Sequence, residues 1–182
     1  NAVLLFLDDD IVYEPMQIAR MCKEAYEREA IVGGAYPVKS EKNCFLTTKP
    51  LDGKRILFSE NGPLVEVRYV ATGCMAIHRK VLQKMIQSGD FMYCHPDSLK
   101  FWPLFQPFPK EVEGIGKVYL SEDWAFCERA RKYGFKVYVD TGVRVGHIGR
   151  YTWDLDDLAR PEKKRNKVIS YQDGCNSDTS RE

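Results

Sequence analysis

Residues 2–10 read AVLLFLDDD, an apolar run that ends in three aspartates. A continuous apolar run of this length predicts a strand buried inside a sheet. Only Asn1 precedes it, and an interior strand with nothing ahead of it indicates a chain cut from a longer protein. The first residues therefore predict both a central strand and an N-terminal truncation.

Strand and helix patterns alternate along the rest of the chain. A helix is expected to begin at Pro15, where a missing N–H costs nothing, and Gly89 and Gly134 are expected just past two later helix ends. Alternation of Val65, Val67 and Tyr69 with charged residues predicts a strand with one solvated face. The expected helices are 15–28, 79–87 and 122–133, and the expected strands are 2–7, 30–32, 64–70, 74–77, 135–139 and 143–145.

Two stretches resist this assignment. Residues 36–62 are turn-rich, and we expect only loops and an edge hairpin there. Residues 90–117 form a long irregular segment with many aromatic side chains, and such segments in compact domains are usually functional. The chain divides into a catalytic region, 1–160, and a polar C-terminal tail, 161–182.

The composition excludes several classes of protein. The 182 residues carry a formal net charge of +1, which argues against a nucleic-acid partner. No apolar run is long enough to span a membrane, and no signal peptide is visible. The six cysteines form no Cys-x-x-Cys pair, and reduced packing cysteines favour a cytoplasmic protein.

The aspartates after the first strand form the first candidate site. Side chains alternate along a strand, so Asp8 and Asp10 are expected on one side and Asp9 on the other. Two converging carboxylates repel each other unless a cation lies between them, and hard oxygen ligands suit Mn²⁺ or Mg²⁺. The alternative is that these residues only pair with the dipole of the following helix.

Two later motifs carry further candidates. Ser121 is a good N-cap, which places Glu122 and Asp123 in the first turn of a helix; such a pair is more often structural than catalytic when taken alone. His147 follows a strand and lies between nearby glycines, where a ligand can approach closely. A lone histidine is usually structural, but carboxylates elsewhere make it a credible metal ligand.

In this order the motifs resemble glycosyltransferase family 2 of the GT-A fold. The matching segments are FLDDD (6–10), TGCMAI (72–77), RKVL (79–82), GDF (89–91), SED (121–123), ERA (128–130), GFKV (134–137) and His147. The resemblance implies an α/β fold with a GT-A-like mixed sheet flanked by helices. The family's nucleotide-binding strands, which precede the Asp-x-Asp strand, are missing, so a nucleotide-binding βαβ region is expected ahead of Asn1.

The resemblance also implies roles for individual residues. Asp8 and Asp10 form an Asp-x-Asp motif that holds Mn²⁺ or Mg²⁺ with His147 as third ligand, and Asp9 and Gly73 complete the cofactor-binding set. Gly73 lies on a loop that lines the acceptor site, although a plain turn glycine is the alternative. Asp123, with Glu122 beside it, is the base that deprotonates the acceptor.

The implied reaction moves a single sugar from a nucleotide-sugar donor to a hydroxyl of a glycan, protein or lipid-linked acceptor, with inversion. The Gln-x-x-Arg-Trp motif of processive synthases is absent, which favours single transfer. Two alternatives stay open. The first motif also resembles haloacid-dehalogenase-type phosphatases, in which Asp8 is the nucleophile and Asp10 the acid/base. The second alternative is that the chain is a non-catalytic glycan-binding module on the same scaffold.

Overall fold

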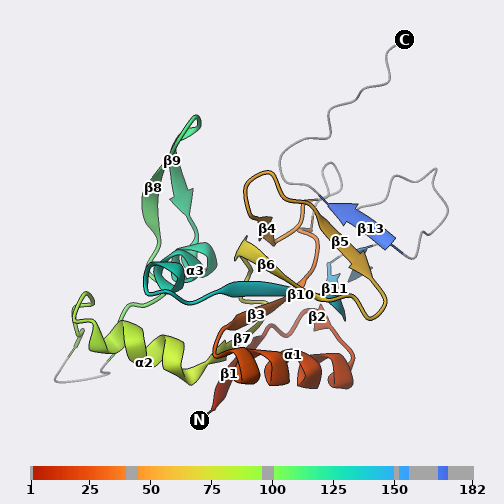
Figure 1. The fold of residues 1–182 in the computed structure, drawn as a ribbon, viewed down its shortest axis with the longest axis horizontal. Coiled ribbons are helices and arrows are strands. Elements are labelled where there is room, and N and C mark those ends of the chain that lie inside the picture. The colour runs from red at the N-terminus through yellow and green to blue at the C-terminus, as the bar shows by residue number, and fades with distance from the viewer. Residues whose placement is uncertain (1, 40–44, 96–100, 150–151, 156–167, 172–182) are drawn as a thin grey trace.

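The computed structural model describes residues 2–39, 45–95, 101–149, 152–155 and 168–171. Its centre is a six-stranded sheet in the order β1-β7-β3-β10-β6-β4 (Figure 1). β10 runs parallel to β3 and antiparallel to β6, while β7 is antiparallel to both its neighbours, so the sheet is mixed. Its strands are β1 (Val3–Leu7), β3 (Ile31–Ala35), β4 (Lys49–Pro50), β6 (Leu64–Tyr69), β7 (Cys74–His78) and β10 (Val137–Arg144).

Helices flank this sheet, which confirms the expected α/β class. Strand β7 shows how both faces are filled. Cys74 and Ala76 pack in one hydrophobic cluster with α1, whereas Met75 and Ile77 pack in the other with α2 and α3. The alternation of side chains along a buried strand produces this division. The helices are α1 (Pro15–Arg28), α2 (Arg79–Gln87) and α3 (Glu122–Lys132).

Three smaller sheets complete the fold, and the hairpin of β8 and β9 projects away from the main sheet (Figure 1). β11 pairs with β2 and β12, β5 pairs with β13, and β8 pairs with β9. These strands are β2 (Ile11–Val12), β5 (Ile56–Ser59), β8 (Phe108–Val112), β9 (Gly116–Leu120), β11 (Gly146–Ile148), β12 (Thr152–Trp153) and β13 (Val168–Tyr171).

Several expectations were wrong in detail. The end of the irregular segment 90–117 lies in the hairpin of β8 and β9, and the strands expected at 135–139 and 143–145 are the single strand β10. Part of the polar tail, Val168–Tyr171, pairs with β5, while the rest of that tail lies outside the described residues. These errors share a cause, since strand pairing is set by distant partners that local patterns do not reveal.

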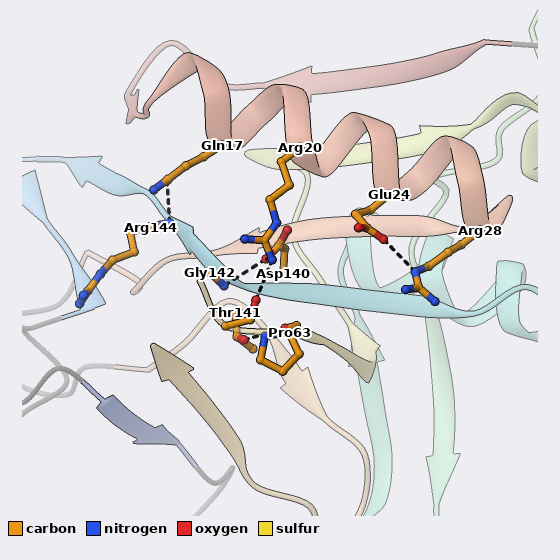
Figure 2. A network of polar contacts seen from close by, with 10 residues as sticks. Gln17, Arg20, Glu24, Arg28, Pro63, Asp140, Thr141, Gly142 and Arg144 are labelled. Carbon is orange, nitrogen blue, oxygen red and sulfur yellow. Dashed lines mark hydrogen bonds and ion pairs between the residues drawn. The ribbon is translucent and has the colours of Figure 1, made fainter. Parts of the chain in front are cut away.

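A polar network fastens α1 to strand β10. Arg20 on the helix contacts the Asp140 carboxylate, with 3.0 Å between Nη2 and Oδ1, and donates a 2.7 Å hydrogen bond to the Gly62 carbonyl (Figure 2). The Asp140 side chain is fully buried, and burial raises its pKa. One turn earlier, the Gln17 side chain accepts a 2.9 Å hydrogen bond from the Arg144 backbone. The helix therefore meets the sheet through charge as well as apolar packing.

Strand β1 was expected to be buried inside the sheet, but it is the first in the sheet order and no strand in the described part of the chain pairs with its outer edge. Two of its leucines are exposed, Leu4 by 43% and Leu5 by 36%.

Free cysteines are Cys22, Cys74, Cys94 and Cys127. Among the described helices, none combines the length and apolarity needed to cross a membrane.

Candidate functional site

The three aspartates lie in a turn directly after β1. The strand ends at Leu7, and the Asp8 backbone N–H donates a 3.0 Å hydrogen bond to the Gly73 carbonyl. Asp8 and Asp9 are exposed, whereas Asp10 is half-buried. The strand periodicity used to place Asp8 and Asp10 on one side therefore stops before the motif begins.

A lysine neutralises the innermost of these carboxylates. Lys39 Nζ forms a hydrogen bond and ion pair with Asp10 Oδ2. This hydrogen bond is the largest cause that lowers the pKa of Asp10. The other oxygen, Oδ1, is buried and has no hydrogen-bond partner among the described residues. Asp10 is therefore held ionised and keeps a free acceptor.

His147 lies beside this carboxylate because β11 pairs with β2. The pairing aligns His147 with Ile11, and the Ile148 N–H donates a 2.7 Å hydrogen bond to the Asp10 carbonyl. The ring Nε2 is 3.6 Å from Asp10 Oδ2, and Nδ1 is 3.0 Å from the Pro37 carbonyl oxygen. A carbonyl only accepts, so Nδ1 donates to it; when the ring is neutral, this leaves the lone pair on Nε2.

Tyr36 is buried and lies next to His147 and Gly73. Its ring meets the His147 ring edge-on, with 5.1 Å between centroids. A Cβ added at Gly73 would lie 2.2 Å from the Tyr36 hydroxyl and 3.1 Å from Asp8 Oδ2, so only glycine fits there. Burial raises the pKa of Tyr36, and the negative charges of Asp8 and Asp123 raise it further. Tyr36 thus lies within electrostatic reach of both carboxylates.

Asp123 approaches Tyr36 from the first turn of α3. Its Oδ1 accepts hydrogen bonds from the Ser121 hydroxyl and, at 2.7 Å, from the Trp124 N–H. Ser121 is the N-cap, as expected, but its side chain makes no capping hydrogen bond, because its hydroxyl donates to Asp123 instead. Burial raises the pKa of Asp123 despite these donors. Glu122 is exposed beside it.

A chain of hydrogen bonds connects the start of α3 to the end of β3. The Tyr36 carbonyl accepts from the Thr47 N–H at 3.0 Å and from the Thr47 hydroxyl at 2.9 Å. The Thr47 carbonyl in turn accepts from Trp124 Nε1 at 3.2 Å. Since Trp124 follows Asp123, this connection fixes the acidic turn of α3 relative to Tyr36.

The structure thus brings Asp10 and His147 together, joins Asp8 to Gly73, and sets Asp123 near Tyr36. Within the described ranges, no group of three or more His, Cys, Asp and Glu side chains is arranged to hold a metal ion. Sequence patterns missed Tyr36 and Lys39. The only local signal was their position just after the buried strand that ends in Gly33, Gly34 and Ala35.

Comparison with models of known protein families found no match, and comparison with curated proteins found none either. Among solved structures, the chain is similar to "Crystal Structure of A197 from STIV", at 19% identity and a TM-score of 0.46. The match covers 81% of this chain and 58% of that chain, so this chain spans little more than half of the matched protein. A likeness this weak carries no argument about function.

Proposed function

We propose that this chain forms the catalytic part of a divalent-metal-dependent, inverting glycosyltransferase. It moves one sugar from a nucleotide-sugar donor to a hydroxyl of a glycan, protein or lipid-linked acceptor. A cytoplasmic location belongs to the same proposal, since the free thiols of Cys22, Cys74, Cys94 and Cys127 suit a reducing compartment.

One observation carries the proposal: a chain of hydrogen bonds through Thr47 joins the buried Tyr36 to the first turn of α3, which carries Asp123. Asp8 follows the first strand, and the negative charges of Asp8 and Asp123 both raise the pKa of Tyr36. A single protein surface with one acidic group for a metal and another for proton transfer supports transfer to a hydroxyl.

The residues around Asp10 fit a divalent cation in part. Asp10 Oδ1 is buried with no hydrogen-bond partner among the described residues, and the contact of Nδ1 with the Pro37 carbonyl leaves Nε2 of a neutral His147 ring as the metal-binding nitrogen. Asp8 is the expected third ligand, with Asp9 and Gly73 beside it. The metal, when bound, supplies positive charge that stabilises the departing diphosphate.

The protein's own groups account for the remaining steps. The acceptor oxygen attacks the anomeric carbon of the donor and forms the new C–O bond. The bond from that carbon to the diphosphate oxygen breaks, and the diphosphate leaves with the electron pair. Asp123 takes the acceptor's hydroxyl proton, and its half-buried position, with Glu122 at the exposed edge, gives a carboxylate of raised basicity. Attack from the face opposite the leaving group inverts the anomeric configuration.

Two variants test this assignment with a panel of nucleotide sugars, Mn²⁺ and mixed glycan acceptors. Asp10→Ala is expected to lose Mn²⁺ affinity in calorimetry, and Asp123→Asn to keep Mn²⁺ affinity but lose about a hundredfold or more in transfer. The matched control is Asp90→Asn, which removes a carboxylate that pairs with Lys132 far from the site. It should change neither property.

The pH dependence gives a second reading of the same base. Asp123 accepts a proton only when ionised, so kcat/KM should rise with pH through its pKa, above the usual value of about 3.9 for aspartate. Asp123→Asn should abolish this acidic limb. Transfer that stays near wild type in that variant, or a product that retains the donor's configuration, would contradict the role of Asp123.

The two alternatives predict different results in the same assays. Phosphate release from a generic aryl phosphate without sugar transfer would favour the phosphatase. Glycan binding that survives a chelator, with no transfer from any donor, would favour the binding module.

A further inference from the structure

A pocket lies beside the first turn of α3, which carries Asp123. It has a volume of about 460 Å³, within the usual range of ligand pockets, and is formed by β6, the hairpin of β8 and β9, and the start of α3. Trp124 lines it, whereas Asp8, Asp10, Asp123 and His147 do not. Its walls include Arg68, Tyr69, Lys110, Val118, Leu120 and Trp124.

Two aromatic rings form one wall and are firmly held. Tyr69 stacks on Trp124, with 5.1 Å between ring centroids and 30° between planes. The Tyr69 hydroxyl donates a 2.8 Å hydrogen bond to Glu128, and the Trp124 ring nitrogen donates to the Thr47 carbonyl. Tyr69 is only 3% exposed and supports the half-buried Trp124, so Trp124 is the rigid ring that can present flat apolar area to the C–H faces of a sugar.

The charged groups around the pocket neutralise one another. Lys110 pairs with Glu128, and Arg68 pairs with Asp52. The lining contains three cations and three acids: Lys49, Arg68 and Lys110 against Asp52, Glu111 and Glu113. A site for phosphate or nucleotide presents an excess of cations, whereas paired charges offer donors and acceptors to uncharged hydroxyls.

The pocket also adjoins the proposed base in sequence and space. Leu120 and Trp124, both in its lining, flank Ser121 and Asp123 on the strand-to-helix connection. A ligand against these two side chains therefore lies next to the turn that carries the base.

We propose that this pocket binds a neutral oligosaccharide, the acceptor of the reaction, and directs its terminal hydroxyl toward Asp123. To call this ligand the acceptor rests on the proposed transferase function. The binding itself requires neither a metal nor a donor. The pocket's balanced charge disfavours acidic glycans.

The test titrates the full chain, in EDTA, with neutral trisaccharides of glucose, mannose or N-acetylglucosamine, and with a uronic-acid trisaccharide for comparison. Binding is followed by saturation-transfer NMR. Val118→Trp fills the pocket, while Tyr119→Trp adds the same ring at a neighbouring position that is 71% exposed and outside the lining. We expect at least one neutral trisaccharide to bind, about tenfold more weakly to Val118→Trp, and unchanged to Tyr119→Trp.

Ile115→Trp provides a second block if Val118→Trp does not fold, because Ile115 lines the pocket yet is 71% exposed. The proposal is overturned if no neutral trisaccharide binds, if the acidic one binds better, or if the blocking variant that folds binds like wild type. Mn²⁺ affinity, measured in parallel, separates the two ideas. If the blocking variant weakens oligosaccharide binding but the chain does not bind Mn²⁺, the pocket proposal stands and the transferase proposal fails. If transfer depends on Mn²⁺ but the block leaves the acceptor KM unchanged, the transferase proposal stands and the pocket proposal fails.

Discussion

At the scale of single residues, the ion pair between Asp10 and Lys39 affects how readily the turn of three aspartates can bind a metal ion. Carboxylates that a cation would otherwise bridge are partly neutralised by a side chain of the same protein. A metal that binds Asp10 must displace this ammonium or share the carboxylate with it. The lysine is therefore an internal competitor of the metal.

Removing the competitor should strengthen metal binding. Lys39→Ala is expected to bind Mn²⁺ about three- to fivefold more tightly, because a partly exposed ion pair is worth up to about 1 kcal/mol. Calorimetry measures the change. Lys80→Ala is the matched control, since Lys80 pairs with Glu29 at the other end of the sheet. Weaker Mn²⁺ binding by Lys39→Ala would instead make Lys39 a supporting residue of the metal site.

At the scale of elements, the contact between α1 and β10 shows an asymmetric ion pair. The Arg20 side chain is 36% exposed, whereas that of Asp140 is fully buried, and Asp140 Oδ2 has no partner among the described residues. Without Arg20, the buried carboxylate keeps its Gly142 N–H donor but loses its counter-charge. Without the charge of Asp140, the arginine still reaches water and the Gly62 carbonyl.

The two halves of this pair should therefore differ in urea unfolding. Arg20→Met is expected to cost about 3 kcal/mol, as breaking a buried pair does, and Asp140→Asn clearly less. Because burial raises the pKa of Asp140, the folded state holds this proton more tightly than the unfolded state. The group's contribution to the free energy of unfolding therefore falls as pH rises through that pKa.

This linkage makes the effect of Arg20→Met depend on pH. The loss in free energy of unfolding should be smaller at acidic pH, where Asp140 becomes neutral and no longer needs the arginine as a counter-charge. Arg28→Met, which removes an exposed pair with Glu24 on the same helix, should be near neutral at every pH. Equal losses for Arg20→Met and Asp140→Asn, independent of pH, would show that packing and not charge explains the network.

At the scale of the whole molecule, the outer edge of β1 is open to pairing. An edge strand with exposed apolar side chains pairs readily with another strand. Leu4 and Leu5 lie on this edge, exposed by 43% and 36%. We expect the chain to self-associate through β1 as its concentration rises, and Leu4→Lys to suppress this in sedimentation velocity. Leu57→Lys, a change at a leucine that is 56% exposed on β5, should not. A wild-type chain that stays monomeric up to millimolar concentration would contradict the expectation.

The sequence by itself determined the elements whose patterns are local. The helix Pro15–Arg28 and the helix Arg79–Gln87 have the predicted bounds, and β1, β6 and β7 lie within a residue of theirs. A helix is defined by contacts between residues three or four apart, and a strand by a short apolar or alternating run, so nearby residues suffice for the bounds, although they did not reveal that β1 is an edge strand. For the same reason Asp8, Asp10 and Asp123 lie at element ends, as expected, whereas His147 was expected after a strand and lies within β11.

Only the tertiary structure decided what these groups meet. Lys39 reaches Asp10 across 29 residues, and the pairing of β11 with β2 brings His147 to the same carboxylate. Tyr36 has no periodic signal, yet its burial against Gly73 places it beside Asp8. The hairpin of β8 and β9, and the pocket it encloses, likewise depend on partners far along the chain. Such contacts form because folding closes long loops onto one sheet, and no short window of sequence contains both partners.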